Sequence, residues 1–226
     1  MDNLSSPRPW PAEIGLLHAI SISKARRDKF VRRCRRNNIS IDRDVQLCAG
    51  VNGNALSRRH YLKNGWLHSD SVLSRGQIGC WESHKALWKK QVSDNIPFMF
   101  IAEDDTCISN TRSQRTRLGA AFNWLEKHRG GKWDALFVTR SNLKKFTKTL
   151  VSRNLGIPGE FWGLNAYILS IKGAKKLLAD SRSNCFDLPV DVVIARMCRN
   201  DQLESYCCTP CVYAIQKENS ATNGII

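Results

Sequence analysis

Short apolar runs alternate with longer amphipathic stretches along the chain. Apolar runs of about 4–8 residues bounded by turn residues predict buried strands, and apolar positions three and four apart predict helices. Strands that alternate with helices indicate an α/β sheet, mostly parallel, with helices on its faces. The predicted strands are 16–22, 39–48, 96–103, 133–139, 167–170 and 212–215, and the predicted helices are 24–37, 75–92, 115–128 and 172–179.

The length and the N-terminal composition predict one domain. A chain of 226 residues can build a substantial core, and it has no internal repeat or clear linker. Residues 1–13 contain three prolines and predict a disordered lead-in to a domain over 14–226. The lead-in lacks the charged and apolar regions of a secretory signal, and no segment is long enough to span a membrane. We therefore expect a cytoplasmic protein that could still act at a membrane surface.

The strand predicted over 96–103 ends in three consecutive acids, Glu103, Asp104 and Asp105. Because side chains alternate along a strand, Glu103 and Asp105 should point one way and Asp104 the other. Ligands of open α/β sheets bind outside the carboxyl ends of the strands, where these acids would lie. Clustered carboxylates suit Mg²⁺ or Mn²⁺, whereas an isolated acidic turn would simply be solvated.

Nine cysteines in a chain of this size are most simply free, buried thiols of a reducing compartment. The segment from Cys185 to Cys211 could also assemble a zinc site, but it lacks a second pair of ligands at the usual spacing.

The net charge of +15 is concentrated in Lys24–Arg36, which predicts a basic amphipathic helix. Such a helix could meet an anionic membrane surface, a phosphorylated glycan or nucleic acid, or it could be only a solvated face. Nucleic acid is the disfavoured partner, because no binding motif or interleaved aromatic platform accompanies the charge.

Several segments in order resemble glycosyltransferase family 25, the lipooligosaccharide and collagen β-galactosyltransferase group. The segment Gly79-Cys80 with Ser83-His84, followed by Glu103-Asp104-Asp105, is the most specific part. The others are Ala49-Gly50-Val51-Asn52-Gly53, Leu73 to Trp88 as a whole, Trp133 to Leu136, Ala166 to Ser170, Lys172 to Leu178 and Pro189-Val190-Asp191.

The resemblance implies a GT-A type, Rossmann-like fold in which the acidic motif holds a divalent metal on a nucleotide-sugar donor. The implied reaction transfers a hexose from a UDP-sugar, with inversion, and galactose is the favoured hexose. The acceptor is the hydroxyl of a glycan, lipid-linked or protein-linked molecule. Glu103 and Asp105 are the candidate ligands of Mn²⁺ or Mg²⁺. Asp104 is assigned to the donor ribose or sugar, or to a supporting contact.

The resemblance also assigns other donor and catalytic residues. Asp191 is the leading candidate for the base that takes the acceptor proton, and Asp187 is the alternative. Asp191 could instead cap a following helix. Ser83 and His84 would lie near the donor nucleotide, or would only hydrogen-bond neighbouring loops. The tryptophans at 81, 88, 124 and 133 could stack on sugar or uracil rings, although 81 and 88 fit a core at helical spacing.

Three donor-site positions depart from the family pattern. Asn52 stands where the family usually has an acid, Gln77 where it has glutamate, and Asn165 where it often has histidine. An amide binds a sugar hydroxyl less strongly than a carboxylate does. A non-catalytic relative that binds a nucleotide-sugar or glycan is therefore the second hypothesis. A nucleic-acid-binding protein or metal nuclease is the third.

Overall fold

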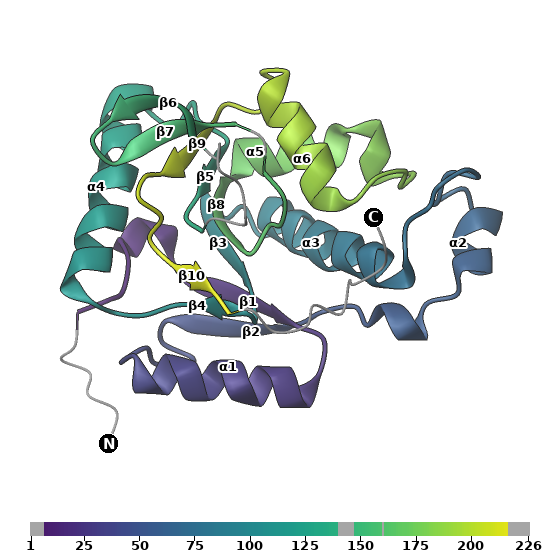
Figure 1. The fold of residues 1–226 in the computed structure, drawn as a ribbon, viewed down its shortest axis with the longest axis horizontal. Coiled ribbons are helices and arrows are strands. Elements are labelled where there is room, and N and C mark those ends of the chain that lie inside the picture. Colours follow the sequence, from purple (N-terminus) through teal and green to yellow (C-terminus); the bar gives the residue numbers. More distant parts are fainter. Residues whose placement is uncertain (1–6, 140–146, 160, 217–226) are drawn as a thin grey trace.

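The computed structural model describes residues 7–139, 147–159 and 161–216, which are built around an eight-stranded sheet (Figure 1). The strands of this sheet are β1 (Leu17–Ser21), β2 (Val45–Ala49), β3 (Phe98–Glu103), β5 (Ala135–Phe137), β6 (Thr147–Ser152), β7 (Leu155–Pro158), β8 (Ala166–Ser170) and β9 (Ser205–Cys208). A second, antiparallel sheet pairs β4 (Thr106–Cys107) with β10 (Ala214–Ile215).

The large sheet is mixed, but most of its strands run in one direction. The order is β2-β1-β3-β8-β5-β9-β7-β6. β1 is parallel to β2 and β3, and β5 is parallel to β9, whereas β8 and β7 are antiparallel to both of their neighbours. The predicted mostly parallel α/β sheet is thus found, with β7 and β8 as the reversed strands. The carboxyl ends of β1, β2 and β3 meet at one edge of the sheet.

Helices cover both faces of the sheet, which is the middle of three layers (Figure 1). The helices are α1 (Lys24–Arg36), α2 (Arg58–Lys63), α3 (Arg75–Ser93), α4 (Arg112–Arg129), α5 (Ile171–Ala179) and α6 (Val190–Arg199), with short 3₁₀ turns at Ala12–Ile14, Gly53–Ala55 and Ser181–Ser183. Within the described ranges, no helix has both the length and the apolar character needed to cross a bilayer.

The strand that carries the acids is buried on both of its faces. Met99 and Ile101 of β3 pack in the core beneath α3, α5 and α6, and Phe100 and Ala102 pack in the core beneath α1 and α4. A strand between two cores needs apolar side chains at every position, which explains the unbroken apolar run. The charged residues therefore begin where β3 leaves both cores.

Most predicted elements are present, and the differences have local causes. α4 begins at Arg112 rather than at 115, because Thr111 and Gln114 form a capping box. The strand predicted over 39–48 is confined to Val45–Ala49, since residues before it form turns. The strand predicted over 212–215 lies outside the large sheet, as β10. The sequence pattern did not predict β9, a buried strand of only four residues.

The lead-in predicted over residues 1–13 is wrong from Trp10 onward. Trp10 is 4% exposed, its indole N–H donates to the Gly15 carbonyl at 2.8 Å, and its ring meets Phe100 edge-on. Burial of this aromatic outweighs the flanking prolines. Residues 1–6 lie outside the described residues.

Of the cysteines in the described residues, four are buried, as expected, and five are partly exposed. Cys207 and Cys208 are neighbours on β9, and their side chains enter the two opposite cores. Because adjacent strand residues face opposite sides of a sheet, these two thiols cannot share one ion. Within the described ranges, no potential metal-binding group contains a cysteine from Cys185 to Cys211. The structure therefore does not support the zinc alternative.

Two glycines bring the turn after β2 into backbone contact with α3. A Cβ on Gly79 would lie 2.5 Å from the Val51 oxygen and 2.9 Å from the Gly53 nitrogen. A Cβ on Gly53 would collide with the Arg75 carbonyl. This contact holds the turn that carries Asn52 at the same edge of the sheet as the acids.

We predict that Gly79→Ala lowers the free energy of unfolding by roughly 1–3 kcal/mol, because the added methyl group must displace backbone atoms. Gly119→Ala in α4 is the matched control, since its Cβ would meet nothing within 4 Å. The control should raise stability by up to about 1 kcal/mol through helix propensity. Urea denaturation followed by circular dichroism measures both changes. Equal losses in the two variants would contradict the role given to the close approach.

Candidate active site at the end of strand β3

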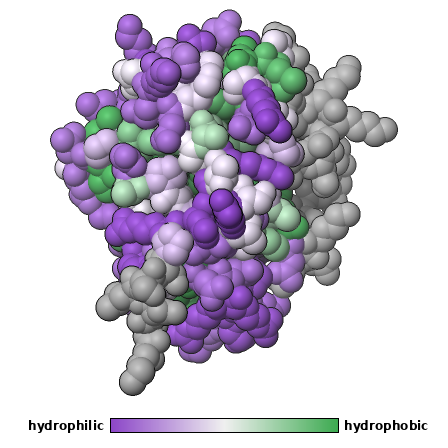
Figure 2. All heavy atoms as spheres, turned by 90° about the vertical axis from the view of Figure 1, so that its left-hand side faces the viewer, coloured by the Kyte–Doolittle hydropathy of each residue, from purple (hydrophilic) through white to green (hydrophobic). Residues whose placement is uncertain are grey.

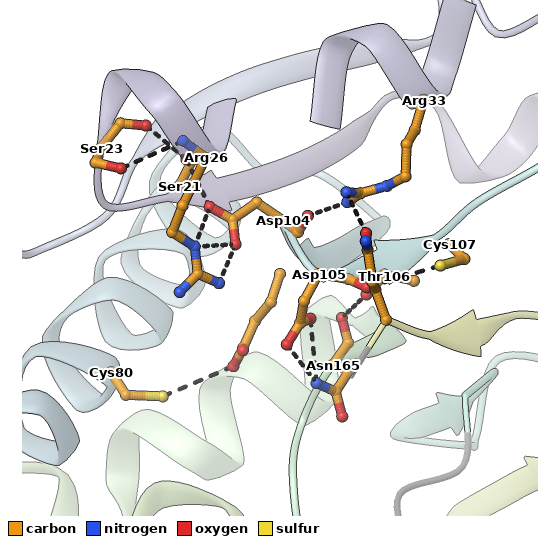
Figure 3. A network of polar contacts seen from close by, with 12 residues as sticks. Ser21, Ser23, Arg26, Arg33, Cys80, Asp104, Asp105, Thr106, Cys107 and Asn165 are labelled. Carbon is orange, nitrogen blue, oxygen red and sulfur yellow. Dashed lines mark hydrogen bonds and ion pairs between the residues drawn. The ribbon is translucent and has the colours of Figure 1, made fainter. Parts of the chain in front are cut away.

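The three acids at the end of β3 have different partners, and Figure 3 shows those of Asp104 and Asp105. The Glu103 carboxylate lies 3.4 Å from His84 Nε2 on α3. The Asp104 carboxylate is bound by Arg26 of α1. The Asp105 carboxylate accepts hydrogen bonds from the Asn165 amide. Asp104 thus turns away from the other two, as strand alternation predicts.

Asp104 is a buried anchor for the start of α1. Its carboxylate is 5% exposed and accepts from Ser21 Oγ at 2.6 Å and from Arg26 Nε at 2.8 and 3.0 Å. Arg33, two turns along α1, donates to the Asp104 carbonyl (Figure 3). Of the two roles predicted for Asp104, the geometry favours the supporting contact over direct contact with a donor.

We predict that Arg26→Gln lowers the free energy of unfolding by roughly 2–4 kcal/mol, because it leaves the buried Asp104 carboxylate without its cation. Arg26 is itself partly exposed, which places the loss below that of a fully buried pair. Arg27→Gln is the control, since Arg27 is exposed on the same turn, and its effect should stay within about 0.5 kcal/mol.

The double variant Arg26→Gln/Asp104→Asn provides the check on this account. Removing both charges should restore part of the stability lost in Arg26→Gln, because no unpaired buried charge remains. Chemical denaturation of the wild type, Arg26→Gln, Asp104→Asn and the double variant measures the coupling between the two side chains. Additive losses would mean that the two side chains do not depend on one another.

Glu103 ends a chain of buried polar groups that crosses from the core to the site. Trp88 Nε1 donates to the Tyr167 hydroxyl at 2.9 Å, and this hydroxyl lies 2.8 Å from His84 Nδ1. His84 Nε2 faces Glu103 Oε1, and the Cys80 thiol lies 3.8 Å from the same oxygen. Both His84 and Tyr167 are 1% exposed, so the chain runs through the core.

The donors and acceptors of this chain determine the tautomer of His84. An indole N–H can only donate, so the Tyr167 oxygen accepts a hydrogen bond from Trp88. The Tyr167 O–H is then left to donate a hydrogen bond to His84 Nδ1. Nδ1 is then the acceptor, and the imidazole proton lies on Nε2, from which it is donated to Glu103. Burial would raise the pKa of Glu103, but the hydrogen bond from His84, together with the charge of Arg26, holds it below its usual value.

Asp105 shows the opposite shift. Burial, followed by repulsion from Glu103, raises its pKa from 3.8 to about 6, although the hydrogen bond from Asn165 opposes the rise. The backbone carbonyl of Asn165 accepts from the Glu103 N–H and the Thr106 hydroxyl, so the same residue ties down both ends of the turn. The Glu103 carboxylate thus repels that of Asp105, whose hydrogen-bond partner Asn165 carries no charge.

We predict that Asp105 makes the metal-free protein less stable between about pH 4.5 and 7. Its pKa is higher in the folded than in the unfolded chain, so the stabilisation from its proton is complete below 3.8 and is lost as the pH rises through about 6. The loss should reach about 1–3 kcal/mol, since one pKa unit corresponds to about 1.4 kcal/mol.

Denaturation in chelator at pH 5 and pH 7 measures this loss, with Asp105→Asn as the comparison. The lowered pKa of Glu103 acts in the opposite direction, but only near and below its usual 4.5. The variant should therefore lose the decline above pH 5. An unchanged slope in the variant would assign the decline to another group.

Three of the predicted donor-binding residues have structural partners. Ser83 Oγ accepts from the Val51 N–H at 2.8 Å and donates to the Gly79 carbonyl at 2.7 Å. Gln77 completes the capping box of α3 with Ser74. Asn52 is exposed and caps the 3₁₀ turn at Gly53–Ala55 through the Asn54 N–H. Asn52 alone of the three presents an exposed side chain at this edge of the sheet.

Asp191 is better placed as a base than Asp187. Asp191 lies in the first turn of α6, two residues after the cap residue Pro189, and its Oδ2 accepts from the Gly163 N–H at 2.7 Å. It is therefore not the N-cap that the alternative interpretation required. Burial first, and then the charges of Glu103, Asp191 and Asp105, raise the pKa of the Cys80 thiol, so all three carboxylates lie within electrostatic range of this sulfur.

Asp187 faces different groups. The pKa of Arg182 is raised first by its hydrogen bond to Asp180 and also by the charge of Asp187. One Asp187 oxygen is buried, and no hydrogen-bond partner for it is found among the described residues.

Most of the tryptophans predicted to stack on a ligand are in the core. Trp81, Trp88 and Trp133 are at most 1% exposed, and Trp124 stacks on His128 of its own helix. The aromatic side chain exposed beside the site is Trp162, which is 57% exposed and next to the Gly163 that binds Asp191. The sequence pattern missed it, because a single aromatic in a loop has no periodicity.

The sequence pattern also missed Cys80 and Tyr167 as parts of the site. Cys80 and His84 are four residues apart, a spacing that places them on one face of a helix. This spacing is the sequence signal that could have identified Cys80 as a partner of His84. Nothing local connects Tyr167 to them, since it lies 83 residues beyond His84.

The fold and the candidate site define an α/β protein with three consecutive acidic residues at the carboxyl end of a central strand. Residues 16–194 match the family described as "Glycosyltransferase family 25 (LPS biosynthesis protein)", and the chain therefore belongs to glycosyltransferase family 25.

The similar proteins include one named as a galactosyltransferase and several named as inactive or probably inactive. A "Glycosyltransferase 25 family member" of Aedes aegypti is 27% identical over 211 residues, which cover 88% of this chain and 34% of the relative. An "Inactive glycosyltransferase 25 family member 3" of Mus musculus is 26% identical over 221 residues, which cover 90% and 36%. "Procollagen galactosyltransferase 2" of Homo sapiens is 24% identical over 197 residues, which cover 81% and 30%. The chain thus spans about a third of the length of these relatives.

Proposed function

We propose that this chain is a metal-dependent, inverting glycosyltransferase of the GT-A type that moves a hexose from a UDP-sugar to a glycan or glycoconjugate hydroxyl. The observation that carries the proposal is the pair Glu103 and Asp105 at the carboxyl end of β3. Burial first, and then repulsion from Glu103, raises the pKa of Asp105, and a bound cation would relieve that repulsion. Galactose is the favoured sugar because one relative carries it in its name.

The residues of this pair fit a hard divalent cation. Carboxylate oxygens are the ligands that Mn²⁺ and Mg²⁺ prefer, and Asn165 orients the Asp105 carboxylate. When bound, such an ion would stabilise the negative charge that develops on the departing nucleoside diphosphate. His84 and Asn165 would hold the two carboxylates in position, and Asp104 would keep α1 against the site.

Asp191 is the proposed base. The Gly163 N–H fixes one of its oxygens, while the other accepts from the Val192 N–H. These contacts hold the carboxylate at the start of α6. From there its charge acts on the Cys80 thiol, as the charge of Glu103 does. There it would take the proton of the acceptor hydroxyl as that oxygen attacks the sugar carbon.

Exposed charges on α1 support an anionic acceptor or membrane surface as partner. Arg26 and Arg33 are engaged by Asp104, whereas Arg27, Arg32, Arg35 and Arg36 are exposed. The lower part of the face shown in Figure 2, where α1 lies, is hydrophilic. The outward residues would attract a phosphorylated glycan or lipid headgroup, and nucleic acid stays the disfavoured partner.

A non-catalytic relative is the second candidate, because several similar proteins are named inactive or probably inactive. The contacts of Gln77 and Asn165 help to choose between an active enzyme and a non-catalytic relative. Gln77 occupies the capping box, as a glutamate there would, and Asn165 still donates to Asp105. Both amides retain structural contacts, so the first candidate is preferred.

We predict metal-dependent hydrolysis of a UDP-sugar by the wild-type protein, measured as UDP release in a donor screen with Mn²⁺. Asp105→Asn should lower the rate by at least about 100-fold, because it removes a charged ligand oxygen. Asp201→Asn is the control, since Asp201 is an exposed aspartate after α6, and its rate should not change.

Asp191→Asn separates catalysis from binding in the same assay. It should slow transfer by roughly 10²–10⁴-fold while donor binding in Mn²⁺, measured by calorimetry, is retained. Wild-type binding without turnover would select the non-catalytic candidate. If the wild-type protein neither binds nor hydrolyses any UDP-sugar, both the catalytic and the non-catalytic candidates are wrong.

A further inference from the structure

Cys80, His84 and Glu103 form a compact group of potential metal ligands on the α3 side of the site. Their ligand atoms all lie within 4.8 Å of one another, and Glu103 Oε1 is 3.8 Å from Cys80 Sγ and 3.4 Å from His84 Nε2. Cys80 and His84 lie one turn apart on α3, and Glu103 ends the strand that packs beneath this helix. Asp105 is not a member of the group.

We propose that these three side chains bind a thiophilic divalent cation such as Zn²⁺, at a position separate from the Mn²⁺ site of Glu103 and Asp105. The donor set decides the class of ion. A thiol, an imidazole and one carboxylate suit Zn²⁺ or Co²⁺, whereas Mn²⁺ and Mg²⁺ favour oxygen ligands. Three protein ligands leave a fourth position open, unlike the closed tetrahedral sites that have only a structural role.

The surrounding charges favour a cation at this position. Glu103, Asp105 and Asp191 all exert a negative field on the Cys80 sulfur. The same field that disfavours a lone thiolate stabilises a dication bound to that thiolate. Arg26 is committed to Asp104, on the other side of the strand end.

The protons of the site must rearrange when the metal binds. The Cys80 thiol releases its proton to solvent, and the sulfur becomes the ligand. The His84 proton moves from Nε2 to Nδ1, so that Nε2 can bind the ion and Nδ1–H can donate to the Tyr167 oxygen. This is the hydrogen bond that typically orients a metal-bound histidine. The Tyr167 proton loses its acceptor in the exchange, which makes the site weaker than a four-ligand zinc site.

Sharing of Glu103 has a functional consequence that rests on the proposed function. When Glu103 is a ligand of Zn²⁺, it is drawn toward α3 and is less able to bind Mn²⁺ together with Asp105. A thiophilic metal should therefore inhibit Mn²⁺-dependent hydrolysis of the donor, and Cys80→Ser should reduce that inhibition.

Co²⁺ titration of the full chain tests the site without any need for activity. The wild-type protein should develop the near-ultraviolet absorption of a cobalt–thiolate bond, and Zn²⁺ should abolish it. Cys80→Ser should lack this absorption and bind Co²⁺ more than about tenfold more weakly. Cys48→Ser is the control, because Cys48 lies on β2 outside the group and its variant should keep the wild-type spectrum.

A measurement on the unaltered protein covers the case in which Cys80→Ser does not fold. Stoichiometric Zn²⁺ should slow alkylation of Cys80, followed by peptide mass spectrometry, and should not slow alkylation of Cys48. A Co²⁺ spectrum unchanged by Cys80→Ser, or equal protection of both thiols, would overturn the site. Thiolate absorption in a protein that does not hydrolyse any donor would uphold the site and reject only the proposed function.

Discussion

Three successive carboxylates at the end of a strand that is buried on both faces impose the main constraint on this structure. An isolated charge in such a place is strongly destabilising, so each acid needs its own partner. The partners come from separate parts of the chain: Arg26 of α1 for Asp104, His84 of α3 for Glu103, and Asn165 before β8 for Asp105. The elements around the carboxyl end of β3 are held together by the need to satisfy these charges.

The three partners are unequal, and this inequality creates the site. Asp104 receives a full positive charge and is nearly buried, so it serves the fold. Asp105 receives only an amide, and Glu103 receives a histidine that is already oriented by Tyr167. The two less compensated carboxylates are therefore the ligands that we propose for a cation. The same logic applies to Cys80, which lies in their field and adds a sulfur ligand on one side only.

The basic helix contributes to the site in a way that its composition conceals. Its charge pattern alone favours a solvated face or an anionic partner, and its outward arginines keep that character. However, Arg26 and Arg33 lie on the inner side and close over the Asp104 turn. Part of the large positive charge is thus a structural counterion for the acids. The number of α1 arginines that can face a partner is therefore smaller than the composition of the helix indicates.

The sequence by itself determined the elements whose signals are local. The unbroken apolar run of β3, the capping box of Ser74 and Gln77, and the amphipathic pattern of α1 each depend on burial or hydrogen bonds within a few residues. Tertiary structure alone decided the role of each acid, the partnership of Cys80 with Glu103, and the place of β9 beside β5. Arg26 and Asp104 lie 78 residues apart, and no periodicity links such positions. They meet because β1 and β3 pair in parallel, which brings their carboxyl ends to one edge of the sheet.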